Sequence, residues 1–242
     1  METKKQFIIL GNMNAITYKE VFPYLMNNEI WLGYKSLNLD MYFNVTNDYK
    51  EWLLANKKEG SAYKIINGVV MGRLASACWF TNIDHGKRHE WLKLDTMAHN
   101  LKFNKKLRKK LEKDFSSIEY PHYDNYDALE IPFTECIPSD YTGVMGVPIT
   151  FMDKYNPEQF AILGITLGNT TPEYAMTQIY KMAVQHNKDG SIKAGGKVNT
   201  RAAVRVDGIP KNTVYYTAEN VDGYLLSIYP RILIQTKKDE SI

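Results

Sequence analysis

The chain opens with a strand, a polar loop and a helix, and this succession restricts its fold class more than any other feature. "QFIIL" (6–10) is a short, partly β-branched run that predicts a buried strand ending in a turn at Gly11. "TYKEVFPYLMNN" (17–28) predicts a helix, with Thr17 as its N-cap and Glu20 completing a capping box. A strand, a loop and a helix in this order form the repeating half-unit of an α/β sheet. We therefore expect an α/β fold.

The polar loop between these two elements contains two asparagines, Asn12 and Asn14. In α/β sheets, ligands bind in the loops that follow the carboxyl ends of the strands, so both side chains are candidates for a binding role. The residues leave a second interpretation open, in which the two side chains only cap the backbone of a turn.

Further segments of the first region have strand or helix character. They are short strands at "IWLGY" (30–34) and "MYFNV" (41–45), a helix at 48–58, a polar turn at 84–90 and a strand "WLKL" at 91–94. The apolar run 68–83 is long enough for two strands or for one bent strand with a bulge at Gly72.

The composition changes at residues 101–115, "LKFNKKLRKKLEKDF". Apolar residues recur there at a spacing of four, at Phe103, Leu107, Leu111 and Phe115, which predicts an amphipathic helix. Its other face is strongly basic, with Lys102, Lys105, Lys106, Arg108, Lys109, Lys110 and Lys113. Such a face is commonly only solvated, but these cations could also neutralise DNA phosphates. We expect two regions, 1–95 and 96–242.

The second region is expected to be rich in strands. Strands are predicted at 126–132, 160–166, 201–206, 213–217 and 230–236, a helix at 172–185, and two turns within 187–199.

The segment 141–160, "YTGVMGVPITFMDKYNPEQF", is the least regular part of this region. Gly143, Gly146 and Pro148 predict a tight backbone path, while Met145, Phe151 and Tyr155 either pack beneath it or face a ligand. "NPEQF" (156–160) predicts a turn that opens the next strand, with Asn156 as a cap and Pro157 as a start signal.

Several kinds of chemistry find no support in the sequence. It has no Walker A loop, GxGxxG or GxSxG motif, and its only Glu-x-Lys precedes every Asp, which argues against a restriction-type nuclease. His85 and His89 lie in a polar turn without a third nearby histidine, which argues against a metal site. Its two cysteines, Cys78 and Cys136, suit a reducing cytoplasm, and no apolar run reaches membrane length.

Four segments carry a resemblance to the EcoRI-type family of adenine-specific DNA methyltransferases. They are "FIILGNMNAITYKEVFP" (7–23), "WLGY" (31–34), "CWFTNIDHGKRHEWL" (78–92) and "DYTGVMGVPITFMDKYNPEQFAILG" (140–164). The resemblance implies a Rossmann-like methyltransferase sheet, of which this chain holds the C-terminal part, followed by a strand-rich target-recognition region. It also implies transfer of a methyl group from S-adenosylmethionine to N6 of an adenine flipped out of double-stranded DNA.

Two parts that the family needs are absent from these 242 residues, namely the glycine-containing S-adenosylmethionine loop and the Asn-Pro-Pro-Phe motif that holds the adenine. "NPEQF" does not replace that motif, because Glu and Gln follow its proline. We therefore expect no catalytic residue here, no methylation by this chain alone, and a separate N-terminal methyltransferase half as a partner. Two alternatives stay open, a non-enzymatic DNA-binding protein derived from such an enzyme and an inactive remnant. An exposed apolar sheet edge would favour a partner chain or a fragment.

Carried over by position, the resemblance implies roles for single residues. Asn12 and Asn14 would lie at the rim of the cofactor cleft. The expected DNA-binding residues are Lys19, Trp79, Phe80, Thr81, Asn82, Lys87, Arg88, Lys105, Lys106, Arg108, Lys109, Met145, Lys154 and Tyr155.

Overall fold

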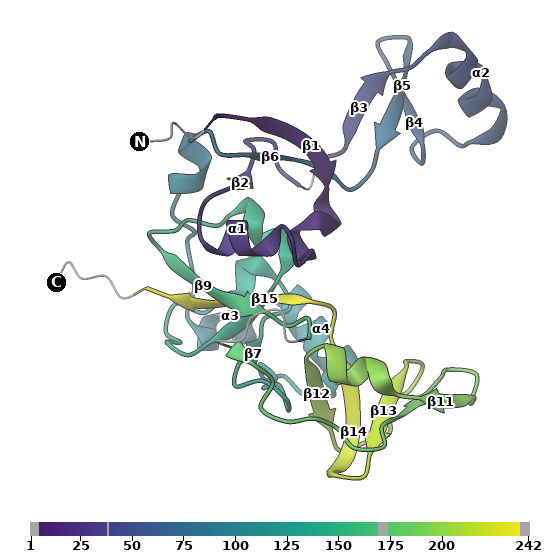
Figure 1. Ribbon diagram of the computed structural model, residues 1–242. Coiled ribbons are helices and arrows are strands. Elements are labelled where there is room, and N and C mark those ends of the chain that lie inside the picture. Colours follow the sequence, from purple (N-terminus) through teal and green to yellow (C-terminus); the bar gives the residue numbers. More distant parts are fainter. Residues whose placement is uncertain (1–4, 38, 169–173, 238–242) are drawn as a thin grey trace. The chain divides into compact units, whose positions relative to one another are not determined.

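The computed structural model describes residues 5–37, 39–168 and 174–237, and these form a mixed α/β structure with several small sheets (Figure 1). The chain divides into two compact units, Met1–Lys87 and Arg88–Ile242, which we call the N-terminal and C-terminal units. Among the described residues, no helix combines the length and the apolar character that crossing a bilayer requires.

The first sheet of the N-terminal unit has three strands in the order β1 (Ile8–Asn12), β6 (Ala77–Thr81) and β2 (Trp31–Leu32), each antiparallel to its neighbour. The prediction of a buried first strand was wrong. Ile8, Ile9 and Leu10 are 63%, 54% and 40% exposed, because the described residues cover neither face of β1, which also lies at the edge of the sheet.

The helix predicted at 17–28 was also wrong in its extent. The chain forms a 3-10 helix, η1 (Met13–Thr17), and then the short helix α1 (Phe22–Met26), which starts after Val21 without a side-chain cap. Thr17 does not act as the N-cap, because its hydroxyl donates back to the carbonyl of Asn14. Pro23 explains the late start, since proline fits the first turn of a helix but not its interior.

A second small sheet of this unit is formed by β3 (Met41–Asn44), β5 (Val69–Leu74) and β4 (Tyr63–Ile66), in that order, together with the helix α2 (Asn47–Asn56). The apolar run 68–83 is thus two strands, β5 and β6. Gly72 pairs in regular register with Phe43 and Tyr63, so the expected bulge is wrong. The polar turn at 84–90 contains a 3-10 helix, η2 (Gly86–His89).

The basic segment of the C-terminal unit is two helices, α3 (Met97–Phe103) and α4 (Lys105–Phe115), rather than one. Asn104 separates them with an extended backbone and caps α4 by accepting a hydrogen bond from the Leu107 amide.

The strand predicted at 91–94 does not form. Leu92 instead bonds through both its N–H and its C=O to the Gln159 side chain, so these groups are not available to a ladder.

The central sheet of the C-terminal unit runs in the order β7 (Leu129–Glu130), β8 (Met145–Pro148), β15 (Arg231–Thr236) and β9 (Phe160–Ile165). Only β7 and β8 are parallel within this sheet. Two 3-10 helices, η3 (Thr134–Cys136) and η4 (Ile149–Asp153), flank β8 in the sequence. Asn156 begins the turn before β9, where its side chain accepts from the Glu158 amide, as predicted.

A five-stranded antiparallel sheet completes this unit, in the order β11 (Ile192–Ala194), β10 (Val184–His186), β13 (Tyr215–Ala218), β14 (Val221–Ser227) and β12 (Ala203–Val206). A 3-10 helix, η6 (Gly196–Thr200), precedes β12. One face of this sheet packs on Tyr180 and Val198, and β12 also contributes to a core with Tyr123 and Leu233.

The helix predicted at 172–185 was wrong over 174–185, and residues 172–173 lie outside the described part. The backbone N–H of Thr177 bonds to Asn125 and that of Tyr180 to Asn199, so neither takes part in a helical ladder. Met182 moreover adopts a left-handed conformation, with φ of 47°. The sequence prediction also missed β8, β11 and β14.

Candidate nucleic-acid interface

Helix α4 presents a row of three lysines, Lys105, Lys109 and Lys113, which we call the lysine ridge. They lie four residues apart and therefore follow one another along one side of the helix. The opposite side carries Leu107 and Leu111, which are completely buried. Because that side is anchored in the core, the ridge faces solvent, and all three lysines are exposed.

Two other cations of α4 are occupied. Lys106 donates to Glu135 at 2.9 Å and lies 3.9 Å from the ring centroid of Phe133, and Lys110 pairs with Asp114. Although partial burial opposes it, the hydrogen bond from Lys106 lowers the pKa of Glu135.

The ridge lysines, in contrast, form none of the ion pairs found among the described residues. Of the residues expected to bind DNA, Lys105 and Lys109 thus lie in the ridge and Arg108 flanks it. Lys113, which the sequence placed on the basic face but not among the expected DNA contacts, completes the row.

The sequence predicted that Phe103 belongs to the apolar stripe of this helix. In the structure it does not extend the stripe of α4. It belongs to α3, is 59% exposed and lies 4.6 Å from the ring of His99, with Lys102 above its face at 5.1 Å.

The end of β6 was expected to lie near DNA. Alternation along the strand leaves Trp79 partly exposed and buries Phe80, so the expected DNA contact of Phe80 is wrong. Thr81 and Asn82 have structural contacts: the Thr81 hydroxyl donates to the Phe7 carbonyl, and the Asn82 carbonyl oxygen accepts from the Phe7 amide. Trp79 and Asn82 are therefore the partly exposed members of this group, and the Asn82 amide is already hydrogen-bonded.

The two asparagines after β1 were expected at the rim of a cofactor cleft. The Asn12 oxygen accepts from the Asn14 backbone at 2.8 Å, so Asn12 caps η1, and the Asn14 side chain is exposed. One cap and one exposed amide do not by themselves form an S-adenosylmethionine site. Nearby, Lys19 is exposed and lies 3.5 Å from Glu20.

The remaining residues predicted to contact DNA differ in their surroundings: some have partners within the protein, one is exposed and two are buried. Lys87 and Arg88 lie in η2, and both have interaction partners within the protein. Lys154 is exposed. Met145 in β8 is completely buried, and Tyr155 is nearly so, with its ring 6.0 Å from that of Phe151; the alternative that they face a ligand is therefore wrong.

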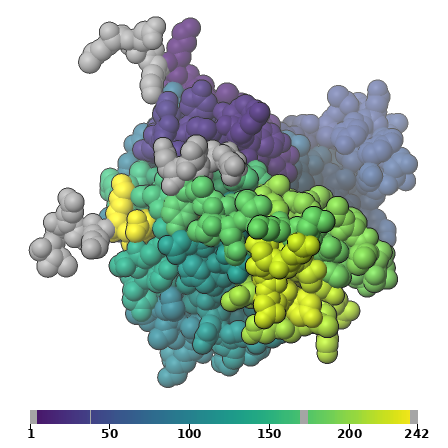
Figure 2. Space-filling view, turned by 60° about the horizontal axis from the view of Figure 1, so that its bottom comes forward, coloured from purple at the N-terminus to yellow at the C-terminus, as the bar shows by residue number. Residues whose placement is uncertain are grey.

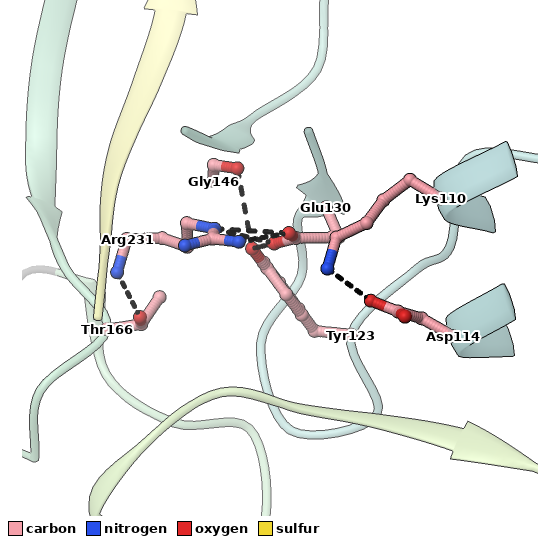
Figure 3. A network of polar contacts seen from close by, with 7 residues as sticks. All are labelled: Lys110, Asp114, Tyr123, Glu130, Gly146, Thr166 and Arg231. Atoms are coloured by element: carbon pink, nitrogen blue, oxygen red, sulfur yellow. Dashed lines mark hydrogen bonds and ion pairs between the residues drawn. The ribbon is translucent and has the colours of Figure 1, made fainter. Parts of the chain in front are cut away.

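A buried polar network lies in the central sheet (Figure 3). Arg231 on β15 donates to both carboxylate oxygens of Glu130 on β7, and the Tyr123 hydroxyl donates to the same carboxylate. The Thr166 hydroxyl accepts from the Arg231 amide at 2.9 Å. Burial, reinforced by the Glu130 charge, raises the pKa of Tyr123 well above its ordinary value. With Glu130 and Tyr123 almost inaccessible, the arrangement stabilises the fold and offers no open site for a substrate.

Metal ligands do not gather in the described residues: no group of three or more His, Cys, Asp or Glu side chains could hold an ion there. His85, one of the candidates, instead contacts the carbonyl of Leu32 through its ring nitrogen at 2.8 Å.

The sequence of the chain is similar to a known protein family and to several known methyltransferases. The family model described as "Adenine-specific methyltransferase EcoRI" matches residues 1–237. The chain is 38% identical over 164 residues to the type II methyltransferase M.EcoRI of Escherichia coli, covering 68% of this chain and 44% of the relative. It is 36% identical over 163 residues to M.MgeORF184P of Mycoplasma genitalium, covering 67% of this chain and 45% of that relative.

A third relative, the type II methyltransferase M.MpnI of Mycoplasma pneumoniae, is 29% identical over 166 residues. The chain thus matches less than half the length of each of these curated relatives. No solved structure matches it. The family model nevertheless extends over nearly all of the chain and confirms the resemblance carried by its motifs. The chain belongs to the family of EcoRI-type adenine-specific methyltransferases.

Proposed function

We propose that this chain is the DNA-binding portion of an S-adenosylmethionine-dependent, N6-adenine DNA methyltransferase of a restriction-modification system. In this proposal, β1, β6 and β2 are later strands of a Rossmann-like sheet, and the region from about residue 96 onward recognises the target. The lysine ridge of α4 is the observation that carries the proposal. A cytoplasmic location, where DNA is accessible to such an enzyme, is part of it.

The ridge suits a polyanion because its charges are regularly placed and unoccupied. A helix rises 1.5 Å per residue, so consecutive ridge lysines are spaced about 6 Å apart along its axis. Free lysines in such a row can replace the counterions that surround the DNA backbone. Arg108 flanks the row, and the exposed Lys154 and the partly exposed Trp79 are further side chains available to DNA in this proposal; Lys19 is exposed but lies 3.5 Å from Glu20. These contacts would position DNA without reading its sequence.

The edge strand β1 supports the presence of a further methyltransferase half, in a partner chain or in a longer form of this one. Consecutive residues of a strand point to opposite faces, so exposure of Ile8, Ile9 and Leu10 leaves both faces of β1 uncovered by the described residues. Sheets of α/β enzymes have both faces covered, and bare apolar edges promote pairing with another chain. A methyltransferase half that adds strands to β1 and covers its faces would satisfy both requirements. It would also supply the cofactor loop and adenine-binding motif, with Asn14 at the rim of the completed cleft.

A non-enzymatic DNA-binding protein derived from such an enzyme is the second candidate. It accounts for the ridge equally well, but it gives no reason for an uncovered apolar edge. The edge therefore favours the first candidate.

The test uses the purified 242-residue chain with duplex DNA of random sequence and S-adenosylmethionine carrying a labelled methyl group. We expect the chain to bind the duplex, with affinity that falls as salt rises, and to transfer no label to DNA. Transfer of label would contradict the proposed need for a partner. Failure to bind duplex at low salt would contradict the DNA-binding role.

A further inference from the structure

Three aromatic rings lie side by side across the five-stranded sheet, His186 on β10, Tyr215 on β13 and Tyr224 on β14; we call them the aromatic ladder. The rings of His186 and Tyr215 are stacked, with centroids 4.6 Å apart and planes 5° from parallel. Tyr224 meets Tyr215 edge-on at 5.5 Å. Strands of this sheet contribute to the molecular surface in the space-filling view (Figure 2), and all three rings are partly exposed.

The stacking leaves no space for a ligand between the rings of His186 and Tyr215. His186 and Tyr215 use their facing surfaces on each other, and Tyr224 packs against Tyr215. Side chains on a strand stand roughly perpendicular to the sheet, so the polar ends of these rings point away from it. A nucleobase therefore has little room to stack between the rings, but it could receive hydrogen bonds from their ends.

The hydroxyl groups of the two ladder tyrosines are also unoccupied. Among the described residues, neither the Tyr215 nor the Tyr224 hydroxyl has a hydrogen-bond partner. His186 is held by one ring nitrogen, which lies 3.0 Å from the Thr217 hydroxyl. On the opposite face of the sheet the situation differs, because the neighbouring Tyr216 donates its hydroxyl to Gln185 at 3.1 Å. Two rigidly placed hydroxyl groups are thus presented without internal partners.

The surroundings of the ladder are open and include charges of both signs. Ile192 on β11 pairs opposite His186 and is 65% exposed, so this side of the sheet is open. The β10–β11 hairpin also carries the exposed Lys188 in its turn, whereas Lys193 pairs with Gln185 and therefore lies on the opposite face of the sheet. Its turn carboxylate, Asp189, accepts hydrogen bonds from the backbone and hydroxyl of Ser191, which lower its pKa, so it remains a charged group of this turn.

We propose that the aromatic ladder reads base edges in a groove of double-stranded DNA, with the hydroxyls of Tyr215 and Tyr224 as the hydrogen-bonding groups. This inference rests on the proposed DNA-binding function and assigns sequence discrimination to a different surface from the lysine ridge. A hydroxyl can both donate and accept, so each tyrosine can match an amino group or a ring nitrogen of a base. A side chain on a strand is held more precisely than one on a loop, which discrimination between bases requires.

The experiment compares the unmodified chain with Tyr215→Phe/Tyr224→Phe, which removes both hydroxyls and keeps the rings and their packing. Each protein is bound to a pool of duplex DNA with a randomised central segment, and the bound molecules are sequenced. We expect the unmodified chain to enrich particular bases and the double variant to lose roughly tenfold of that preference at one or more positions. Affinity for the unselected pool should change by less than about twofold, because phosphate contacts dominate it.

Two controls separate the possible failures. Lys105→Gln/Lys109→Gln/Lys113→Gln should weaken binding to the whole pool and keep the base preference. Tyr229→Phe, at an exposed tyrosine outside the ladder, should change neither quantity. An unchanged preference in the ladder variant, or no preference in the unmodified chain, would overturn this inference and leave DNA binding intact. Absence of any binding to the pool would overturn the proposed function as well.

Discussion

Arg231 and Glu130 form a bidentate ion pair that crosses the central sheet, with the arginine Nε 3.1 and 3.0 Å from the two carboxylate oxygens. Their strands, β15 and β7, are not neighbours, because β8 runs between them. Gly146 of β8 pairs with Glu130, and its missing side chain leaves room for Tyr123 beside the ion pair (Figure 3). Gly146, which lies in the irregular segment 141–160, therefore provides the space that the Tyr123 ring of the buried network occupies.

Replacing Glu130 with glutamine should destabilise the C-terminal unit by about 3–5 kcal/mol, since it leaves a buried guanidinium without a charged partner. Denaturant unfolding followed by circular dichroism measures the change. Asp114→Asn provides the control, because it breaks the pair of Asp114 with Lys110 on a helix surface and should cost about 0.3–0.5 kcal/mol. Equal effects of the two substitutions would show that the buried pair is not important for stability.

Gly146→Ala should destabilise the same unit by roughly 1–3 kcal/mol, because the added methyl group would lie 2.8 Å from ring carbons of Tyr123. Gly86→Ala is the matched control, since nothing lies within 4 Å of the position its methyl group would take. Thermal melting of both variants checks the prediction. Similar melting temperatures for the two would contradict the close approach of Tyr123.

Stability should fall at alkaline pH. Burial raises the pKa of the Cys136 thiol from 9.0 to about 12 and that of Cys78 to about 11. Above pH 9.0 the unfolded chain loses these protons while the folded chain keeps them, so their contribution is complete below pH 9.0 and is lost as the pH rises toward about 12. Unfolding free energies measured across this window should decline less steeply for Cys136→Ala. An unchanged slope in that variant would contradict the assignment.

The uncovered edge of β1 should make the isolated chain associate as its concentration rises. Ile9→Lys places a charge in the middle of this edge and should keep the chain monomeric in sedimentation experiments. It should alter the free energy of unfolding by no more than about 0.5 kcal/mol, because Ile9 is more than half exposed. Tyr229→Lys, in an exposed loop, should still associate. If both variants associate like the unmodified chain, β1 is not the reactive edge.

Sequence patterns located most elements where a short-range signal was strong. The strands β9, β12, β13 and β15 lie in predicted segments, and the burial of Leu107 and Leu111 followed from their spacing. The α/β class was also predictable. The family was predictable from four motifs, and the match over residues 1–237 confirms it.

Failures arose where long-range contacts replaced local ones. The Gln159 side chain takes the backbone bonds that a strand at Leu92 would have used, and Asn125 and Asn199 hold the segment expected to be a helix. Periodicity also cannot reveal that β1 is an edge strand. Likewise, it cannot tell that Lys106 is paired, because its partner Glu135 comes 29 residues later, whereas the pair of Lys110 with Asp114 has a local spacing of four.

The salt dependence of the DNA binding proposed for the lysine ridge is the most direct test of this function. Kobs for a duplex of random sequence would be measured against salt concentration for the unmodified chain and for Lys105→Gln/Lys109→Gln/Lys113→Gln. Loss of three phosphate contacts should make the slope of log Kobs against log salt shallower by about 2 to 3. The control Lys106→Gln/Lys110→Gln removes cations already paired with Glu135 and Asp114, and should change the slope by less than about 1. An unchanged slope in the ridge variant would contradict the assignment of α4 as the DNA-binding surface.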